Sequence, residues 1–166
     1  MERANVLDIQ HLTKVFSRGL IKRSHLVALE DFSLSISDDR PTITTIAGES
    51  GSGKTTLARL VLGLLTPTSG QVLFEGKDIW HMSRDEWMRY RRQVQAVFQD
   101  PFEVYNPFYK VEHVLDMVVE EFKLAKDRAE ADTMIRETLE VLGLRPDEIL
   151  GKFPHQLSGG QRQRVM

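Results

Sequence analysis

A glycine-rich run near residue 50 has the composition of a loop that binds a chain of phosphate groups. It reads Gly48-Glu49-Ser50-Gly51-Ser52-Gly53-Lys54-Thr55-Thr56. Glycines let the backbone turn several N–H donors toward one anion without a Cβ clash. Lys54 would place a positive charge near the terminal phosphates, and the Thr55 hydroxyl would face a bound Mg²⁺. The run therefore predicts a site for a triphosphate and its magnesium ion.

A second run, Leu157-Ser158-Gly159-Gly160-Gln161, suits the same kind of ligand. Ser158 stands where an N-cap residue would begin a helix, so its hydroxyl and the N–H groups of the two glycines would face outward. We interpret this run as a second surface that contacts phosphate. At average residue usage the five-residue pattern would arise by chance in roughly one chain in several thousand. Its presence in the same chain as the first run is therefore a specific indication of phosphate binding.

The residues around the first run predict a strand, a loop and a helix in that order. Residues 42–47 are a short β-branched run, which favours a strand. Apolar residues then recur at helical spacing over residues 54–64, and this helix is expected to end near Gly63. A turn at residues 66–70 leads into a predicted strand at residues 71–74. A phosphate-binding loop requires a strand before it and a helix after it.

Other patterns place the remaining elements around this loop. Alternating apolar residues over 6–16 and 32–36 predict half-buried strands and an antiparallel layer. Ser83 and Glu86 have the spacing of a capping box, which predicts a helix to about Arg92.

The following part of the chain predicts mainly helices. A brief strand is expected at residues 95–99, and helical spacing follows over residues 114–122 and 129–142. Gly143 is the predicted C-cap of the last of these helices. Together they predict a helical subdomain that lies between Gln99 and the second glycine run.

The composition is that of one soluble globular domain or part of one. The chain has 166 residues, 41% of them hydrophobic, and a formal net charge of -2, so no nucleic-acid partner is expected. Its longest apolar stretch, residues 60–65, is far shorter than the ~20 residues that cross a bilayer. With no signal segment at the start, a cytoplasmic location is expected. The absence of cysteine excludes disulfides and thiolate metal sites.

The two glycine runs together resemble those of the ATP-binding cassette (ABC) ATPases. Further segments are similar to the oligopeptide and dipeptide importer branch of this family, namely residues 14–16 with the basic loop up to Arg23, and residues 97–101, 105–107 and 153–164. The resemblance covers nearly the whole chain. It implies an α/β fold, a P-loop NTPase cassette with a three-layer α/β core, an N-terminal antiparallel β layer and a helical subdomain, in which the C-terminal part of the core is missing.

The resemblance also implies a role for each site residue. ATP and Mg²⁺ are the implied cofactors, bound by residues 48–56, with Thr55 and Gln99 as ligands of Mg²⁺. Phe16 matches the aromatic residue that stacks on adenine, although a phenylalanine also suits a core position. In the family the second glycine run, called the signature run below, acts in trans on ATP held by a second cassette subunit. The residues concerned are Ser158, Gly159, Gly160 and Gln161.

The implied organisation is a single partial cassette. Residues 1–99 would form the β layer and P-loop core, residues 100–155 the helical subdomain, and residues 156–166 the signature run with the start of its helix. The implied partners are a second cassette subunit, transmembrane permease subunits and, indirectly, an extracytoplasmic solute-binding protein. Such a subunit would lie on the cytoplasmic face of the cell membrane.

Three family residues that support hydrolysis have no counterpart in this chain: the Walker B aspartate, the catalytic glutamate and the switch histidine. No catalytic residue is therefore assigned, with Gln99 counted only as the glutamine that senses Mg²⁺ and water, and the chain alone is not expected to hydrolyse ATP. Two other hypotheses remain beside the importer subunit. One is a soluble cassette ATPase without a transporter, and the other is a non-hydrolysing fragment that acts in trans on another cassette.

Overall fold

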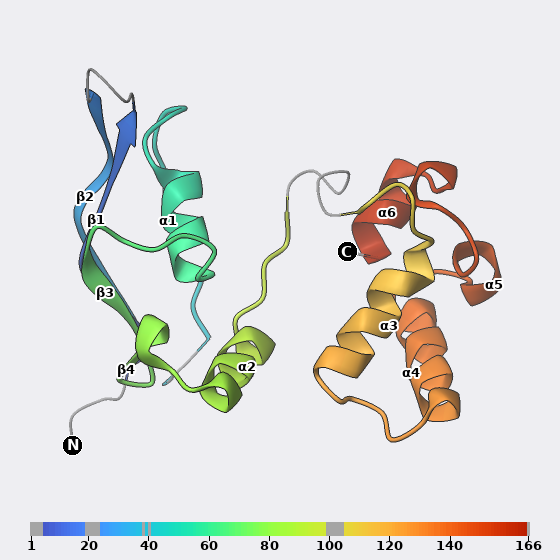
Figure 1. The fold of residues 1–166 in the computed structure, drawn as a ribbon. Helices are drawn as coiled ribbons and strands as arrows, with labels where there is room; N and C mark the ends of the chain where they lie inside the picture. The colour runs from blue at the N-terminus through green and yellow to red at the C-terminus, as the bar shows by residue number, and fades with distance from the viewer. Residues whose placement is uncertain (1–4, 19–23, 38, 40, 99–104, 166) are drawn as a thin grey trace. The chain divides into compact units, whose positions relative to one another are not determined.

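The computed structural model describes residues 5–18, 24–37, 39, 41–98 and 105–165. These residues form two units, and each is described by itself (Figure 1). The N-terminal unit lies within residues 1–95 and the helical unit within residues 96–166. The finer division of the chain at residues 99 and 155 stays a prediction.

The N-terminal unit is built on an antiparallel sheet. β1 (Asn5–Arg18) pairs with β2 (Ser24–Ser37) on one side and with β3 (Ser69–Phe74) on the other, and β4 (Lys77–Asp78) pairs with β3. Among the described residues the strand order is β2-β1-β3-β4. The predicted N-terminal β layer is thus confirmed, and its first two strands are longer than the apolar alternation indicated.

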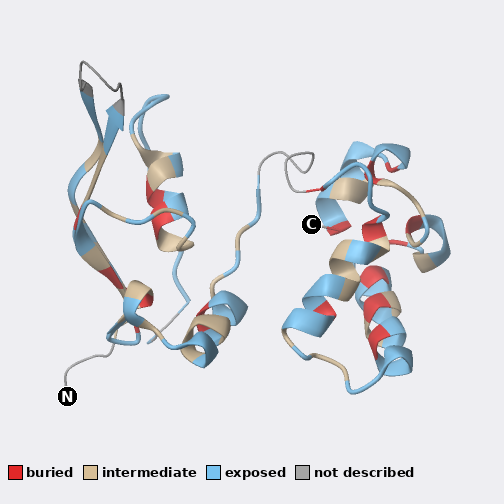
Figure 2. Ribbon diagram, in the orientation of Figure 1, coloured by how far each residue is buried: buried red, intermediate tan, exposed pale blue. Residues whose placement is uncertain are grey.

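Helices pack on this sheet and form the core of the unit with it. α1 (Lys54–Val61) lies along the β1–β2 pair, and α2 (Arg84–Gln93) follows the 3-10 turn η1 (Ile79–His81) (Figure 1). The buried side chains come from β1, α1, β3, η1 and α2 (Figure 2): Leu7, Ile9, Leu12, Leu57, Leu60, Val72, Phe74, Ile79 and Tyr90. A register shift in β1 between Ile9 and Leu12 brings both of these side chains to the core, although they are not an even number of positions apart.

The strands predicted at residues 42–47 and 95–99 are not formed in the described residues, and Gln99 itself lies outside them. Apolar side chains in both segments are exposed, Ile43 at 97% and Val97 at 84%. A parallel strand needs neighbours to pair its backbone groups and cover its faces. The described residues place no strand beside either segment. The two strand predictions were wrong because β-branching and alternation indicate suitable residues and say nothing of a pairing partner.

The helical unit contains α3 (Val111–Glu121), α4 (Arg128–Val141), α5 (Pro146–Ile149), the 3-10 turn η2 (Pro154–Gln156) and α6 (Gly159–Val165). α3 and α4 lie side by side, and Figure 2 shows buried positions along both. The core of the unit consists of Tyr105, Val111, Val119, Ala131, Ile135, Leu139, Leu144, Ile149, Leu157 and Val165. The two helices predicted for this part are confirmed to within a few residues at each end.

α4 ends just before the predicted glycine, with Leu142 as its C-cap residue and Gly143 at the next position. Gly143 has φ 68, its N–H donates to the carbonyl of Glu140 at 2.9 Å, and the N–H of Leu144 donates to the carbonyl of Leu139 at 2.9 Å. These two bonds are a Schellman motif, and the buried side chains of Leu139 and Leu144 supply its apolar contact.

α2 begins with the predicted capping box. Ser83 Oγ accepts a hydrogen bond from the N–H of Glu86 at 3.4 Å, and the Glu86 carboxylate accepts one from the N–H of Ser83 at 2.8 Å. Lys77 in β4 donates to both carboxylate oxygens of Glu86 at 2.6 Å. The bond from Lys77, followed by those from Ser83, lowers the pKa of Glu86 to about 2. One carboxylate therefore ties α2 to the edge of the sheet.

We expect Glu86 to make the N-terminal unit sensitive to acid. Its carboxylate has a pKa of 4.5 in the unfolded chain and about 2 in the folded one, so its stabilisation is complete above pH 4.5 and is lost as the pH falls toward 2. The difference in free energy of unfolding between the wild type and Glu86→Gln should shrink over this range. Urea unfolding followed by the fluorescence of Trp80 and Trp87 measures it, with Asp85→Asn as the matched control. A difference that does not change with pH would contradict the prediction.

Candidate functional site

The predicted phosphate-binding run, residues 48–56, consists of a loop over residues 48–53, which is closed by its own backbone, and the first three residues of α1. Gly51 and Gly53 have φ 84 and 92, the left-handed conformation that glycine adopts without strain. The N–H of Ser52 donates to the carbonyl of Glu49 at 3.2 Å, and the N–H of Leu57 donates to the carbonyl of Gly53 at 2.8 Å. Residues 48–52 are exposed. An anion can therefore approach the loop and the positive end of α1 from solvent.

Gly53 anchors the loop to the sheet. A Cβ at this position would lie 2.2 Å from the carbonyl oxygen of Ala28 in β2, a distance that no side chain can tolerate. Glycine is needed here for two reasons, the positive φ and the close approach of the two backbones. β2 thereby sets where α1 begins.

Lys54 points back into the loop that precedes it. Its Nζ donates to the carbonyls of Gly48 and Glu49 at 2.8 and 2.7 Å, and it lies 3.2 Å from Ser52 Oγ. These oxygens hold the ammonium group inside the curve of the loop. A positive charge is thus already in place beside the backbone N–H groups.

The far end of α1 is fixed by α2. The Tyr90 hydroxyl donates a hydrogen bond to the carbonyl of Val61, the last residue of α1. Burial raises the pKa of Tyr90 to about 12, so the hydroxyl keeps its proton and remains a donor at neutral pH. Phe74 of β3 contacts the Tyr90 ring edge-on at a centroid distance of 5.1 Å. α1 is therefore held at both ends.

Phe16 lies in β1 with 38% of its surface exposed. The Nζ of Lys14 is 5.2 Å from the centre of its ring, and Lys14 is itself held by the carbonyl of Thr66 at 2.7 Å. Phe16 pairs with Leu26 of β2, two residues from the Ala28 that Gly53 approaches. An exposed ring near the loop is unlike a core side chain. The stacking of the Phe16 ring on adenine stays a prediction.

The signature run begins α6 with a reciprocal cap. Ser158 Oγ accepts from the N–H of Gln161 at 3.2 Å, and Gln161 Oε1 accepts from the N–H of Ser158 at 2.9 Å. The expected N-cap role of Ser158 is thus observed. A Cβ added at Gly159 or Gly160 would meet nothing within 4 Å.

The predicted site residues are divided between the two units, each of which is described by itself. Phe16 and residues 48–56 belong to the N-terminal unit, whereas the signature run belongs to the helical unit. Gln99 lies outside the described residues. Within the described ranges, no group of three or more His, Asp or Glu side chains could hold a metal ion. No helix in this part of the chain is long and apolar enough to cross a membrane.

Comparison with known proteins identifies the family. The family model described as ABC transporter matches residues 29–166, most of the chain. The chain belongs to the ABC transporter family. Members of this family bind ATP, in agreement with the ligand that the two glycine runs predict.

The peptide-importer resemblance is confirmed among the relatives of this cassette. The chain is 37% identical to the dipeptide transport ATP-binding protein DppF of Lactococcus lactis subsp. cremoris, and the match covers 99% of this chain and 52% of that protein. It is 32% identical to the oligopeptide transport ATP-binding protein OppF of Streptococcus mutans, covering 98% of this chain and 51% of that protein. The chain thus spans about half the length of these relatives.

The cassette fold is confirmed by solved structures. The bacterial ABC transporter cassette MJ0796, solved as a dimer, matches with a TM-score of 0.70 and 26% identity over 96% of this chain and 66% of that one. The cbiO1 protein of Clostridium perfringens matches with a TM-score of 0.66 and 29% identity over 98% of this chain and 59% of that one.

One polar contact of the cassette was not foreseen from the sequence. Arg164, which follows the signature run, bonds to the carbonyls of Gly160, Leu142 and Gly143. Its place in the importer-like segment was the only signal in the sequence. Because Leu142 and Gly143 lie far from it along the chain, only the folded unit shows this contact.

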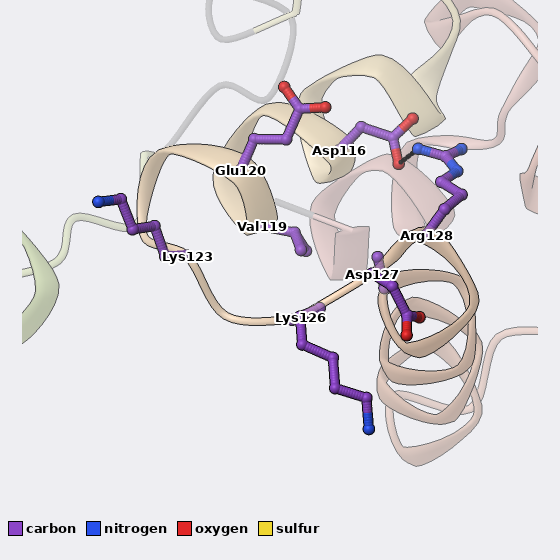
Figure 3. A pocket seen from close by; sticks show the side chains of 9 residues that line it. Asp116, Val119, Glu120, Lys123, Lys126, Asp127 and Arg128 are labelled. Carbon is purple, nitrogen blue, oxygen red and sulfur yellow. Dashed lines mark ion pairs between the residues drawn. The ribbon is translucent and has the colours of Figure 1, made fainter.

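A cleft of about 350 Å³ lies in the helical unit, between the end of α3 and the start of α4, and no residue of either glycine run lines it (Figure 3). Its charged lining residues are Asp116, Glu120, Lys123, Lys126, Asp127 and Arg128. Arg128 pairs with Asp116 at 2.8 Å, and the labelled ends of Lys123 and Lys126 point outward in Figure 3. The balanced charges give this cleft no preference for an anion, so it is not a candidate for the nucleotide.

Substitution of Gly53 tests the anchor of the loop. Gly53→Ala should lower the free energy of unfolding of the N-terminal unit more than Gly51→Ala does. Both variants incur the cost of a left-handed alanine, about 1–2 kcal/mol, but only the first meets a carbonyl oxygen, since a Cβ at Gly51 has nothing within 4 Å. Urea unfolding by tryptophan fluorescence measures both. Equal losses would show that β2 does not constrain the loop.

Proposed function

We propose that this chain is the nucleotide-binding part of an ATP-binding subunit that energises a membrane importer of peptides or related small solutes. The observation that carries the proposal is the loop at residues 48–53, which leads into α1 and holds the ammonium group of Lys54 inside it. The signature run in the same chain and the similarity to peptide-transport ATP-binding proteins support it.

ATP with Mg²⁺ fits the groups that the loop presents. The backbone N–H groups and the Lys54 ammonium would bind the phosphates, and the exposed Thr55 hydroxyl is a proposed ligand of Mg²⁺. Gln99 is the second proposed ligand. Phe16 is the proposed platform for adenine, because its ring is open to solvent and has a π face for stacking.

The signature run is proposed to act on ATP bound by a second cassette subunit. Glycine at positions 159 and 160 is not required by contacts within the described chain. We attribute these glycines to a ligand that approaches the backbone closely, with the Ser158 hydroxyl as a further donor and Gln161 beside it. The dimeric form of the similar cassette MJ0796 supports this arrangement.

The remaining partners and the chemistry are proposed for the whole subunit. Permease subunits would bind it at the cytoplasmic face of the membrane, and a solute-binding protein would act through them. Hydrolysis is assigned to the part of the relatives that these residues do not span, because water-orienting and Mg²⁺-supporting carboxylates are required for it.

The loop is tested by removing its charge. Loss of a hydrogen-bonded ammonium group costs about 1.5–3 kcal/mol, so Lys54→Ala should raise the dissociation constant for MgATP about 10- to 100-fold. Isothermal titration measures it. Arg59→Ala, which removes one positive charge from the last turn of the same helix, is the matched control. Unchanged affinity in Lys54→Ala would count decisively against the nucleotide site.

The proposed role in transport is tested by identifying the proteins that bind this subunit in the cell. We expect an affinity-tagged form, extracted with mild detergent, to copurify with membrane-spanning permease subunits that mass spectrometry identifies. A tagged protein that binds MgATP normally but is recovered only with soluble partners would favour the cassette ATPase without a transporter.

A further inference from the structure

The side chain of Arg164 connects the signature run to the end of α4. Its Nε donates to the carbonyl of Gly160 at 3.3 Å, and its Nη1 donates to the carbonyls of Leu142 and Gly143 at 3.4 and 3.3 Å. One guanidinium group therefore bonds to two helices at once.

The end of α4 suits a cation. The last carbonyls of a helix have no partner within it and carry the negative end of the helix dipole. A guanidinium group has donors in several fixed directions, so Nε and Nη1 can serve Gly160 and α4 together. A lysine has a single ammonium group on a flexible stem and is poorly suited to hold both.

Arg164 also fixes a peptide group of the signature run itself. The carbonyl of Gly160 bonds to Arg164, and the N–H of the same peptide group, which belongs to Gln161, bonds to Ser158 Oγ at 3.2 Å. Leu157 and Val165 bury apolar side chains at the two ends of this segment. Apolar contacts are not directional, so they place α6 without orienting its peptide groups.

We propose that Arg164 is a positioning residue of the signature run. By holding α6 against the end of α4, it sets the direction in which the N–H groups of Gly159 and Gly160 face a phosphate. This inference rests on the proposed function, because the phosphate is that of the ATP assigned there to a second subunit.

Hydrogen exchange of the nucleotide-free chain tests the position directly. We expect the amides of Gln161 and Arg162 to exchange about tenfold faster in Arg164→Lys and Arg164→Met, as expected for the loss of one charge-assisted hydrogen bond. Arg145→Lys is the matched control, because Arg145 also follows α4 but pairs with Glu148 at 2.7 Å. Equal exchange in all four proteins would overturn the proposal.

Nucleotide-driven association separates positioning from simple stabilisation. At matched folded concentrations, Arg164→Lys should weaken the MgATP-dependent association of two copies about 100-fold, because each copy loses one charge-assisted bond worth about tenfold. Titration should give the loop of this variant a dissociation constant for MgATP close to that of the wild type. Association equal to that of the wild type would overturn the proposal. If the wild type binds MgATP and does not associate, the trans role in the proposed function fails, and the exchange experiment still decides the position of Arg164.

Discussion

The close approach of Gly53 to the carbonyl of Ala28 is the contact on which the glycine-rich loop before α1 depends. Because the contact leaves no space for a Cβ at residue 53, it fixes the point on β2 beside which the loop ends and α1 begins. The other end of α1 is fixed by the bond from Tyr90 to Val61. With both ends held, the loop can present its N–H groups and Lys54 to an anion without first ordering them, which lowers the entropic cost of binding.

The helical unit holds its own glycine run by a different means. The signature run follows the 3-10 turn η2, and its buried apolar anchors are Leu157, which precedes α6, and Val165, the last residue of α6. Polar groups orient the peptide groups of the signature run, through the reciprocal cap between Ser158 and Gln161 and through the bond from Arg164. In both units a glycine-rich segment is also contacted by a residue outside its motif, Ala28 for the first run and Arg164 for the signature run.

The ends of helices were predicted well from the sequence, whereas most contacts between distant segments were not. The capping box at Ser83, the C-cap at Gly143 and the N-cap at Ser158 were all found from residue type and spacing, because each involves residues within one helical turn. The strand expected at residues 42–47 failed since a strand needs partners as well as suitable residues. The contact between Gly53 and Ala28 had no sequence signal, as these residues approach only when α1 packs on β2.

The sequence by itself determined the chemistry of this protein: two glycine runs, a lysine, a threonine and a serine of the types that bind phosphate, and a likeness to ABC cassettes that the comparisons confirm. Residue type and local spacing suffice for this, because backbone N–H groups and short side chains act over a few residues. Only the tertiary structure decided what holds these groups in place. The supports, from Ala28, Tyr90 and Arg164, are a close backbone approach and hydrogen bonds between segments far apart in the chain, and they form only once the helices of each unit have packed, which no local pattern contains.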